Sequence, residues 1–286
     1  MASSTERGFG SLAAATSAGH AVFAFTLVAL GILGLSRGDF APVWQEIPDG
    51  VPARESLAYL CSVVYLGCGL GLLWQRTVTR AARMLLGWLL LWMLLFKVPD
   101  IVRAPTVEGP YQSCAQNAVL VAAAWVLYAW CAADSDRRRL GFLVGESGLR
   151  SARLLYGLAL VAFGLSHFAY LQLTAPLVPR WLPSPVFWAY FTGVTYLAAA
   201  AAIFSGRCAR LAVALSALQM GLFTLVVWPP ILAAGANEFR WSEFVMSWAL
   251  TAAAWVVADS YRGTPWLALT PGALKLHAHA AIKRSA

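Results

Sequence analysis

The stretch RTVTRAARMLLGWLLLWMLLFKVPDIV (76–102) opens with basic residues, continues as an apolar run, and reaches a lysine, a proline and an aspartate where the run ends. The stretch GRCARLAVALSALQMGLFTLVVWPPIL (206–232) repeats this outline in the second half of the chain, with a valine and a proline in the places of Lys97 and Asp100. Each run is long enough to cross about 30 Å of hydrocarbon as a helix. The pair therefore predicts two membrane-spanning helices at equivalent places in a repeated fold.

The composition of the whole chain indicates the same environment. Of its 286 residues, 60% are apolar and 12% are charged, and the mean hydropathy is +0.66. Soluble globular proteins average about 45–50% apolar and about 25% charged residues. This chain has too little polar surface to stay in solution, so we predict an integral membrane protein.

Apolar runs of spanning length occur eight times, at about 17–35, 56–75, 81–99, 113–133, 153–172, 186–205, 209–229 and 243–260. The runs are continuous and do not alternate as barrel strands do, and a backbone in lipid must bond internally. We predict an all-α bundle of eight transmembrane helices. The first run lacks a small-x-small cleavage site after it, so we expect it to remain a helix.

The positively charged residues divide unevenly between the two sides of this bundle. Placing the N-terminus on one side leaves six of the 21 Lys and Arg residues on the other: Arg37, Arg54, Lys97, Arg103, Arg180 and Arg240. Cytoplasmic loops carry the excess of Lys and Arg. We therefore predict cytoplasmic N- and C-termini and a bacterial-type inner (cytoplasmic) membrane. The formal net charge of +8 then reflects topology and lipid headgroups, and we expect no nucleic-acid partner.

Further matches at an offset of 130 or 131 extend the repeat along the chain. They are GLS at 34–36 and 164–166, IPDGVP (47–52) and VPRWLP (178–183), Tyr59 and Tyr65 with Tyr190 and Tyr196, and AAAW at 122–125 and 252–255. An even number of helices per repeat makes the repeats parallel. We predict a first four-helix unit at 1–133, a basic cytoplasmic linker at 134–152, a second four-helix unit at 153–262 and a cytoplasmic tail at 263–286.

The second unit resembles a known family. The stretch GLSHFAYLQLTAPLVPRWLPSPVFWAYFTGVTYLAAAAAIF (164–204), the short basic turn after it and the WPP end of the next helix are similar to a DoxX-like unit. The resemblance implies a four-helix membrane protein, and some members are linked to quinone-dependent oxidation or to membrane oxidoreductase complexes. A tandem duplication departs from the usual single unit, and Arg37 stands in the first unit where His167 stands in the second.

Two groups of residues are candidates for chemistry on the outer side. In the first unit, Lys97 and Asp100 share a helix face if the helix continues, and Arg103, Tyr111 and Gln112 follow. The ordinary interpretation is a lysine at the interface with its stem in lipid and a capped helix end. The functional alternative is a polar cavity between the third and fourth helices, because ionisable groups in spanning segments often mark sites.

In the second unit, His167 ends a helix near three aromatic residues, Tyr170, Trp181 and Trp188. A neutral imidazole can bond a quinone carbonyl and titrates near neutral pH, and aromatic rings could stack on the quinone. A lone histidine is more often a satisfied interfacial residue. We therefore keep these four residues as candidate quinone ligands beside that ordinary interpretation.

The five cysteines include no C-x-x-C pair, and no flavin, haem or iron–sulfur motif occurs. Cys61 and Cys114 both fall near the outer side and could form a disulfide there, although cysteines also serve as small packing residues. Quinone is therefore the one cofactor we expect, and no motif in this chain encodes it. No metal site is expected.

Three functions follow from these observations. The first is a redox-linked membrane subunit, surrounded by lipid, with a quinone or lipid site near the outer leaflet and with membrane or periplasmic subunits as electron-transfer partners. The second is a non-catalytic structural or assembly subunit of a larger membrane complex. The third is a transporter, which tandem repeats and proline-broken helices favour. No ionisable residue stands in the middle of a predicted helix, so the transporter ranks last.

Overall fold

The computed structural model describes residues 17–48 and 50–269 and confirms the eight predicted spanning helices. The described residues form helices and loops and contain no strand. The spans are α2 (Ala18–Arg37), α3 (Arg54–Leu73), α4 (Val78–Trp92) with its extension, α6 (Gly109–Cys131), α8 (Gly145–Ala169), α10 (Pro185–Ser205), α11 (Ala209–Leu222) with its extension, and α13 (Glu238–Asp259). Most of the predicted tail, 270–286, lies outside the described residues.

The connections contain short helices. They are α7 (Asp134–Arg139), α9 (Leu171–Thr174) and the 3-10 turn η2 (Ala175–Leu177). The segment predicted as a linker, 134–152, holds α7 and the first turns of α8, which begins at Gly145 with Glu146 in its first turn. A carboxylate at that position favours the helix N-terminus. The helix therefore starts earlier than its apolar run indicates.

The third helix of each repeat continues past its proline, where the sequence predicted an end. In the first repeat, α4 passes through one π-helical turn, η1 (Met93–Lys97), into α5 (Val98–Arg103). In the second, α11 passes through η3 (Phe223–Val227) into α12 (Trp228–Gly235). A proline lacks an N–H, and its ring would meet the carbonyl four residues earlier. The wider π turn displaces that carbonyl, so the helix continues past the proline.

A second feature recurs where the second helix of each repeat begins. Ala53 precedes α3 and Ser184 precedes α10, and both have left-handed backbone angles, with φ of 53° and 54°. Each follows a proline, Pro52 or Pro183, that ends the repeated P-x-x-x-P segment. The same unusual backbone at equivalent positions shows that the sequence repeat is a structural repeat.

Glycines in the repeated GLS motif bring the first two helices of each repeat together. A Cβ on Gly34 would overlap Ser62 Oγ, and a Cβ on Gly164 would lie 3.0 Å from the Gly193 carbonyl oxygen. Ser62 and Gly193 themselves occupy equivalent positions of the two repeats. Small residues allow close helix approach in a membrane, so the motif recurs in both repeats for packing.

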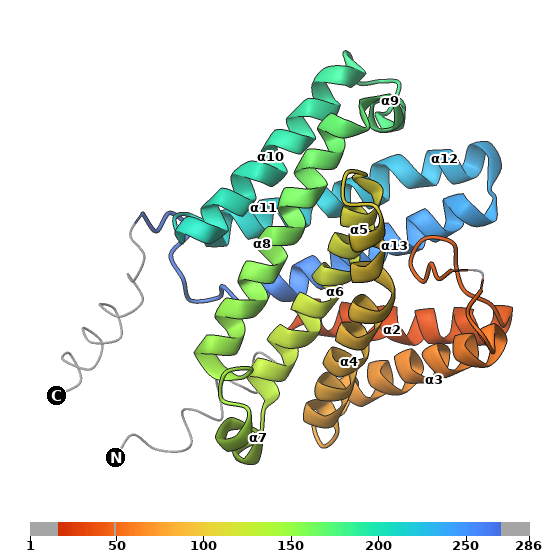
Figure 1. The fold of residues 1–286 in the computed structure, drawn as a ribbon. Helices are drawn as coiled ribbons and strands as arrows, with labels where there is room; N and C mark the ends of the chain where they lie inside the picture. The colour runs from red at the N-terminus through yellow and green to blue at the C-terminus, as the bar shows by residue number, and fades with distance from the viewer. Residues whose placement is uncertain (1–16, 49, 270–286) are drawn as a thin grey trace.

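The eight spans pack side by side, and the last span, α13, returns to the first, α2 (Figure 1). Within each repeat, consecutive helices pack together. The first helix of each repeat then packs on the fourth helix of the other, α2 on α13 and α8 on α6. The Trp248 indole of α13 donates to Thr26 of α2 at 3.0 Å. We call the side where α2 ends and α13 begins the distal side.

The fourth helices of the two repeats, α6 and α13, also pack on each other. Both helices carry buried alanines, Ala122–Ala124 and Ala252–Ala254, which are 0–1% exposed. The repeated AAAW motif thus supplies small buried side chains to two helices that pack together, and small side chains allow close approach.

All five cysteines are free thiols, so the structure does not contain the Cys61–Cys114 disulfide considered from the sequence. Cys61 is fully enclosed in the packing of α3, whereas Cys114 is half-buried and lies near the Lys97 ammonium group. The two thiols therefore belong to different surroundings.

Candidate functional site

A cleft lies on the distal side where the two repeats meet, between the end of α2 and the start of α13. Its deeper part has a volume of about 230 Å³ and is lined by Leu33, Gly34, Arg37, Asp39, Ala41, Trp44, Trp241, Ser242 and Val245. It adjoins a hollow of about 470 Å³ that shares Arg37, Asp39 and Trp241 and adds Ala236, Asn237 and Glu238. Both repeats contribute walls, so the cleft depends on the exchange of helices between them.

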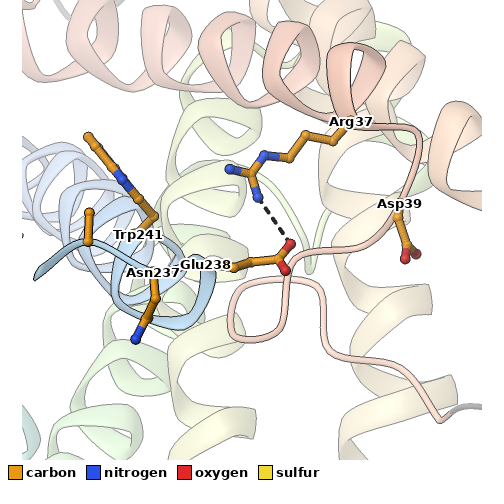
Figure 2. Close-up of a pocket in the computed structure, with 6 residues that line it drawn as sticks. Arg37, Asp39, Asn237, Glu238 and Trp241 are labelled. Carbon is orange, nitrogen blue, oxygen red and sulfur yellow. Dashed lines mark hydrogen bonds and ion pairs between the residues drawn. The ribbon is translucent and has the colours of Figure 1, made fainter.

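Arg37, the last residue of α2, supplies the positive charge of this cleft. Its guanidinium donates to Glu238 Oε1 across the cleft at 3.1 Å (Figure 2). The two side chains are 43% and 65% exposed, so both remain in contact with the surroundings. Among the described residues Glu238 is the one acceptor of Arg37, which leaves other guanidinium N–H groups for a ligand.

Asp39, although close by, is engaged elsewhere. Its carboxylate accepts from the Phe40 amide at 2.7 Å and from Arg54 Nε at 2.8 Å. The bond from the Phe40 amide, and then the bond and charge of Arg54, hold the pKa of Asp39 below its ordinary value of 3.8. Asp39 therefore stays ionised on the loop and does not neutralise Arg37.

The floor of the cleft is apolar and carries one unused donor. Leu33 and Gly34 of α2 and Val245 of α13 lie in helices long and apolar enough to span a membrane, so the floor follows these two helices. Trp44, on the loop after α2, is 8% exposed, and its indole N–H has no partner among the described residues. The Val43 amide donates to Ser242 Oγ at 2.9 Å, which fixes this loop on α13.

The residues predicted around Lys97 separate in the structure. Lys97 is 4% exposed; its ammonium donates to the Glu46 carbonyl at 3.3 Å and lies 3.7 Å from a Glu46 carboxylate oxygen. Asp100 and Arg103 form an ion pair at 2.7 Å, with side chains 40% and 66% exposed. The structure thus turns Lys97 inward under the loop after α2, while Asp100 and Arg103 remain at the surface.

The residues predicted around His167 separate as well. Nδ1 of His167 donates to the Phe163 carbonyl at 2.7 Å, and its ring centroid lies 5.8 Å from that of Tyr196. Trp181 is 72% exposed, and Trp188 packs on Phe187 and Phe191.

Tyr170 has a different task. Its hydroxyl accepts from the Gly109 amide at 3.1 Å, at the start of α6. The ring beside His167 is that of Tyr196, which was not among the predicted site residues. In the sequence Tyr196 stood out only as the match of Tyr65 in the repeat.

A second junction, equivalent to the cleft, lies where α8 ends and α6 begins. The Ser166 hydroxyl donates to Glu108 Oε1, and Oε2 of Glu108 is buried without a partner among the described residues. Burial raises the pKa of the Glu108 carboxyl above its ordinary 4.5, and the Ser166 bond opposes that shift.

Glu108 and Glu238 were absent from the sequence-based candidates. The signal that could have found them is that they occupy equivalent positions of the two repeats, as Arg37 and His167 do.

The cleft can bind a molecule that has an apolar part and an oxygen acceptor at one end. Arg37 is the donor at the mouth, the Trp44 indole N–H is buried and unpartnered among the described residues, and the α2 and α13 faces are apolar. Among the described residues no group of three or more His, Cys, Asp or Glu side chains could hold a metal ion. Comparison of the chain with models of known protein families, with curated proteins and with solved structures found no match.

Proposed function

We propose that this protein is a redox-linked membrane subunit that binds an amphiphile, a quinone or a lipid, in the distal cleft between α2 and α13. The observation that carries the proposal is the pairing of a cationic mouth at Arg37 with a floor that continues into the spanning helices. A quinone carbonyl or a lipid phosphate would accept from the guanidinium, and the tail would lie along the floor.

The fit to a quinone rests on two donors and one shape. Arg37 and Trp44 both line the cavity, the Trp44 N–H is buried without a partner among the described residues, and a ring with two carbonyl groups needs two donors. When bound, a quinone would supply two-electron chemistry. This chain would bind and orient it and keep its ring at the membrane surface.

The redox link rests on the resemblance of 164–204 to DoxX-like proteins, and electrons would come from a membrane or periplasmic partner subunit. The predicted setting is a bacterial-type inner membrane with both termini in the cytoplasm, which puts the cleft at the outer leaflet. In the second repeat, His167 remains the proposed polar contact, now with Tyr196 beside it.

Native mass spectrometry of the protein, extracted gently from its own membrane, tests the proposal. We expect a retained quinone or phospholipid whose occupancy falls at least about tenfold in Arg37→Gln, because a charged hydrogen bond contributes about 1.5–3 kcal/mol. Arg103→Gln is the matched control, since Arg103 is exposed and pairs with Asp100 outside the cleft lining. The mass of the molecule distinguishes quinone from lipid.

The second candidate function is a structural or assembly subunit. It is favoured by exposed aromatic side chains at the distal end of α10 and the loop before it, Trp181, Phe187, Tyr190 and Phe191. Such a surface can dock on a helix of another membrane subunit. A stoichiometric complex that holds no small molecule on this chain would support this function and contradict the cleft as a ligand site.

A further inference from the structure

Glu243 is an ionisable residue inside a spanning helix, α13. It does not line the cleft and, among the described residues, makes no hydrogen bond or ion pair that would support the fold. It lies five residues after α13 begins and is half-buried. No hydrogen bond or ion pair joins it to another described residue, and no charged side chain interacts with it. A carboxyl group inside a membrane segment is costly and commonly marks an ion or proton site.

The face of α13 that carries Glu243 is polar for two further turns. Ser247 and Thr251 follow at intervals of four residues, which places the three side chains on one side of the helix. Both hydroxyls contact Thr224 of η3, with oxygen–oxygen distances of 2.6 Å from Ser247 and 3.0 Å from Thr251. Thr224 is 1% exposed, so this polar face meets the π-helical turn in the interior.

The hydroxyl cluster has more acceptors than hydrogens. Thr224 also bonds the Met220 carbonyl at 2.8 Å, and Thr251 bonds the Ser247 carbonyl at 2.9 Å. Four contacts therefore share the hydrogens of three hydroxyl groups. The surplus of oxygen lone pairs suits a positive charge.

The prolines after η3 add a further acceptor. The Leu225 carbonyl stands four residues before Pro229 and five before Pro230, so neither an α-helical nor a π-helical N–H is available to it. Carbonyls released in this way at broken helices coordinate Na⁺ and protons in other membrane proteins. This carbonyl belongs to the residue directly after Thr224 in η3.

The first repeat shows that the fold does not require this polar set. The positions of the first repeat that correspond to Glu243, Thr224 and Thr251 hold Ser113, Leu94 and Val121, and the position of Ser247 holds Asn117, which is polar and buried. The same π-helical turn forms in that repeat, between α4 and α5, without a carboxyl group. The carboxyl group and the two threonine hydroxyls are therefore features of the second repeat alone.

The charged groups at the distal ends of α13 and the elements packed on it have other partners. Glu238 pairs with Arg37, Arg240 bonds the Gly235 carbonyl, Glu108 bonds Ser166 and His167 bonds Phe163. Elements η3 and α12 carry no charged residue. None of these groups would compete with Glu243 for a cation, and η3 and α12 have no positive side chain to repel one.

We propose that Glu243, with the hydroxyls of Thr224, Ser247 and Thr251, binds one monovalent cation, a proton or Na⁺, within the membrane. The site is separate from the Arg37 cleft, so either can fail without the other. A cation site within the membrane would also support the transporter function, which ranked last from the sequence.

The test is labelling of the full-length protein in lipid nanodiscs with N,N′-dicyclohexylcarbodiimide, which reacts with protonated carboxyl groups in apolar surroundings. Peptide mass spectrometry then locates the label. We expect Glu243 to be labelled, at least about tenfold more than Glu238, which is exposed and ion-paired on the same helix. Glu243→Gln should lose the label at that peptide, and Glu238→Gln should keep it.

Two conditions identify the cation. Protection by NaCl but not by choline chloride assigns Na⁺, whereas labelling that rises as the pH falls, equally in both salts, assigns a proton. No label at Glu243, or a label independent of pH and salt, overturns the proposal.

Thr224→Val with Ser247→Ala tests the hydroxyls while keeping the carboxyl group. We expect about tenfold more Na⁺ for half-protection, or a labelling midpoint at higher pH because the carboxylate loses polar neighbours. An unchanged profile would overturn the role of the hydroxyls.

Discussion

Glu108 and Glu238 occupy equivalent positions of the two repeats and make equivalent junctions on the distal side of the bundle. Glu238 begins α13 and pairs with Arg37, the last residue of α2. Glu108 directly precedes α6 and accepts from Ser166, in the last turn of α8. Each junction joins the fourth helix of one repeat to the first helix of the other. The two junctions are therefore equivalent in the fold. They differ in chemistry, because one is an exposed ion pair and the other is a bond from a serine to a buried carboxyl group.

The Arg37–Glu238 pair should contribute little to stability. Both side chains are largely exposed, and such pairs are worth about 0.2–1 kcal/mol. In a double-mutant cycle, Arg37→Glu with Glu238→Arg should restore most of what either change loses, and the coupling should shrink at high salt. Thermal unfolding in detergent measures it. A coupling well above that range would show that the pair holds the repeats together.

The Glu108 junction should depend on pH in the opposite sense to an ordinary ion pair. Burial raises the pKa of Glu108 above 4.5 in the folded state, so folding favours the protonated carboxyl. Its contribution is complete below the unfolded pKa and is lost as the pH rises through the folded pKa.

We expect Glu108→Gln, a neutral side chain of similar shape, to reduce the fall in unfolding temperature above pH 4.5. Unfolding temperatures measured over a pH series test this expectation. Identical pH profiles for the two proteins would show that Glu108 titrates normally.

Gly164 should not tolerate a methyl group. A Cβ there would lie 2.6 Å from Leu197 Cγ and 3.0 Å from the Gly193 carbonyl oxygen, so α8 and α10 would have to separate. We expect Gly164→Ala to cost about 1–3 kcal/mol of unfolding free energy. Gly67→Ala is the control, because no atom lies within 4 Å of its added Cβ. Equal unfolding temperatures for the two variants would contradict the close approach of the helices.

Lys97 should be replaceable by a long apolar side chain. The equivalent residue of the other repeat is the buried Val227. The Glu46 side chain is 64% exposed, so its carboxylate stays in contact with the surroundings when the Lys97 ammonium is removed, and no buried charge is left unpaired. We expect Lys97→Met to change the unfolding free energy by less than about 1.5 kcal/mol, and Lys97→Ala to lose about 2–5 kcal/mol through a cavity. If methionine is as harmful as alanine, the ammonium group itself is needed, which would support a site at this position.

Several parts of the fold were predictable because they repeat in the sequence. The eight spans follow from apolar length alone, and the AAAW and GLS matches mark the contacts of α6 with α13 and of each first helix with its second. The helix ends were less predictable. The third helices pass their prolines through η1 and η3, because a single π turn accommodates the ring within a continuing helix.

The candidate residues were less predictable than the fold. Lys97 and Asp100 are three residues apart, yet one is enclosed by Glu46 and the other is paired at the surface. Helical spacing fixes which face of its own helix a residue occupies. It does not state which neighbour covers that face.

The sequence by itself determined that this chain is a membrane protein of eight helices in two repeats, because hydrophobic length and repetition are local properties. The tertiary structure alone decided that α2 packs on α13 and α8 on α6. That exchange creates the cleft at Arg37. Within the second repeat, the packing of α13 on η3 joins Ser247 and Thr251 to Thr224. The reason is physical: in a bilayer every helix is apolar enough for lipid, so small-residue contacts and a few polar bonds select its neighbours.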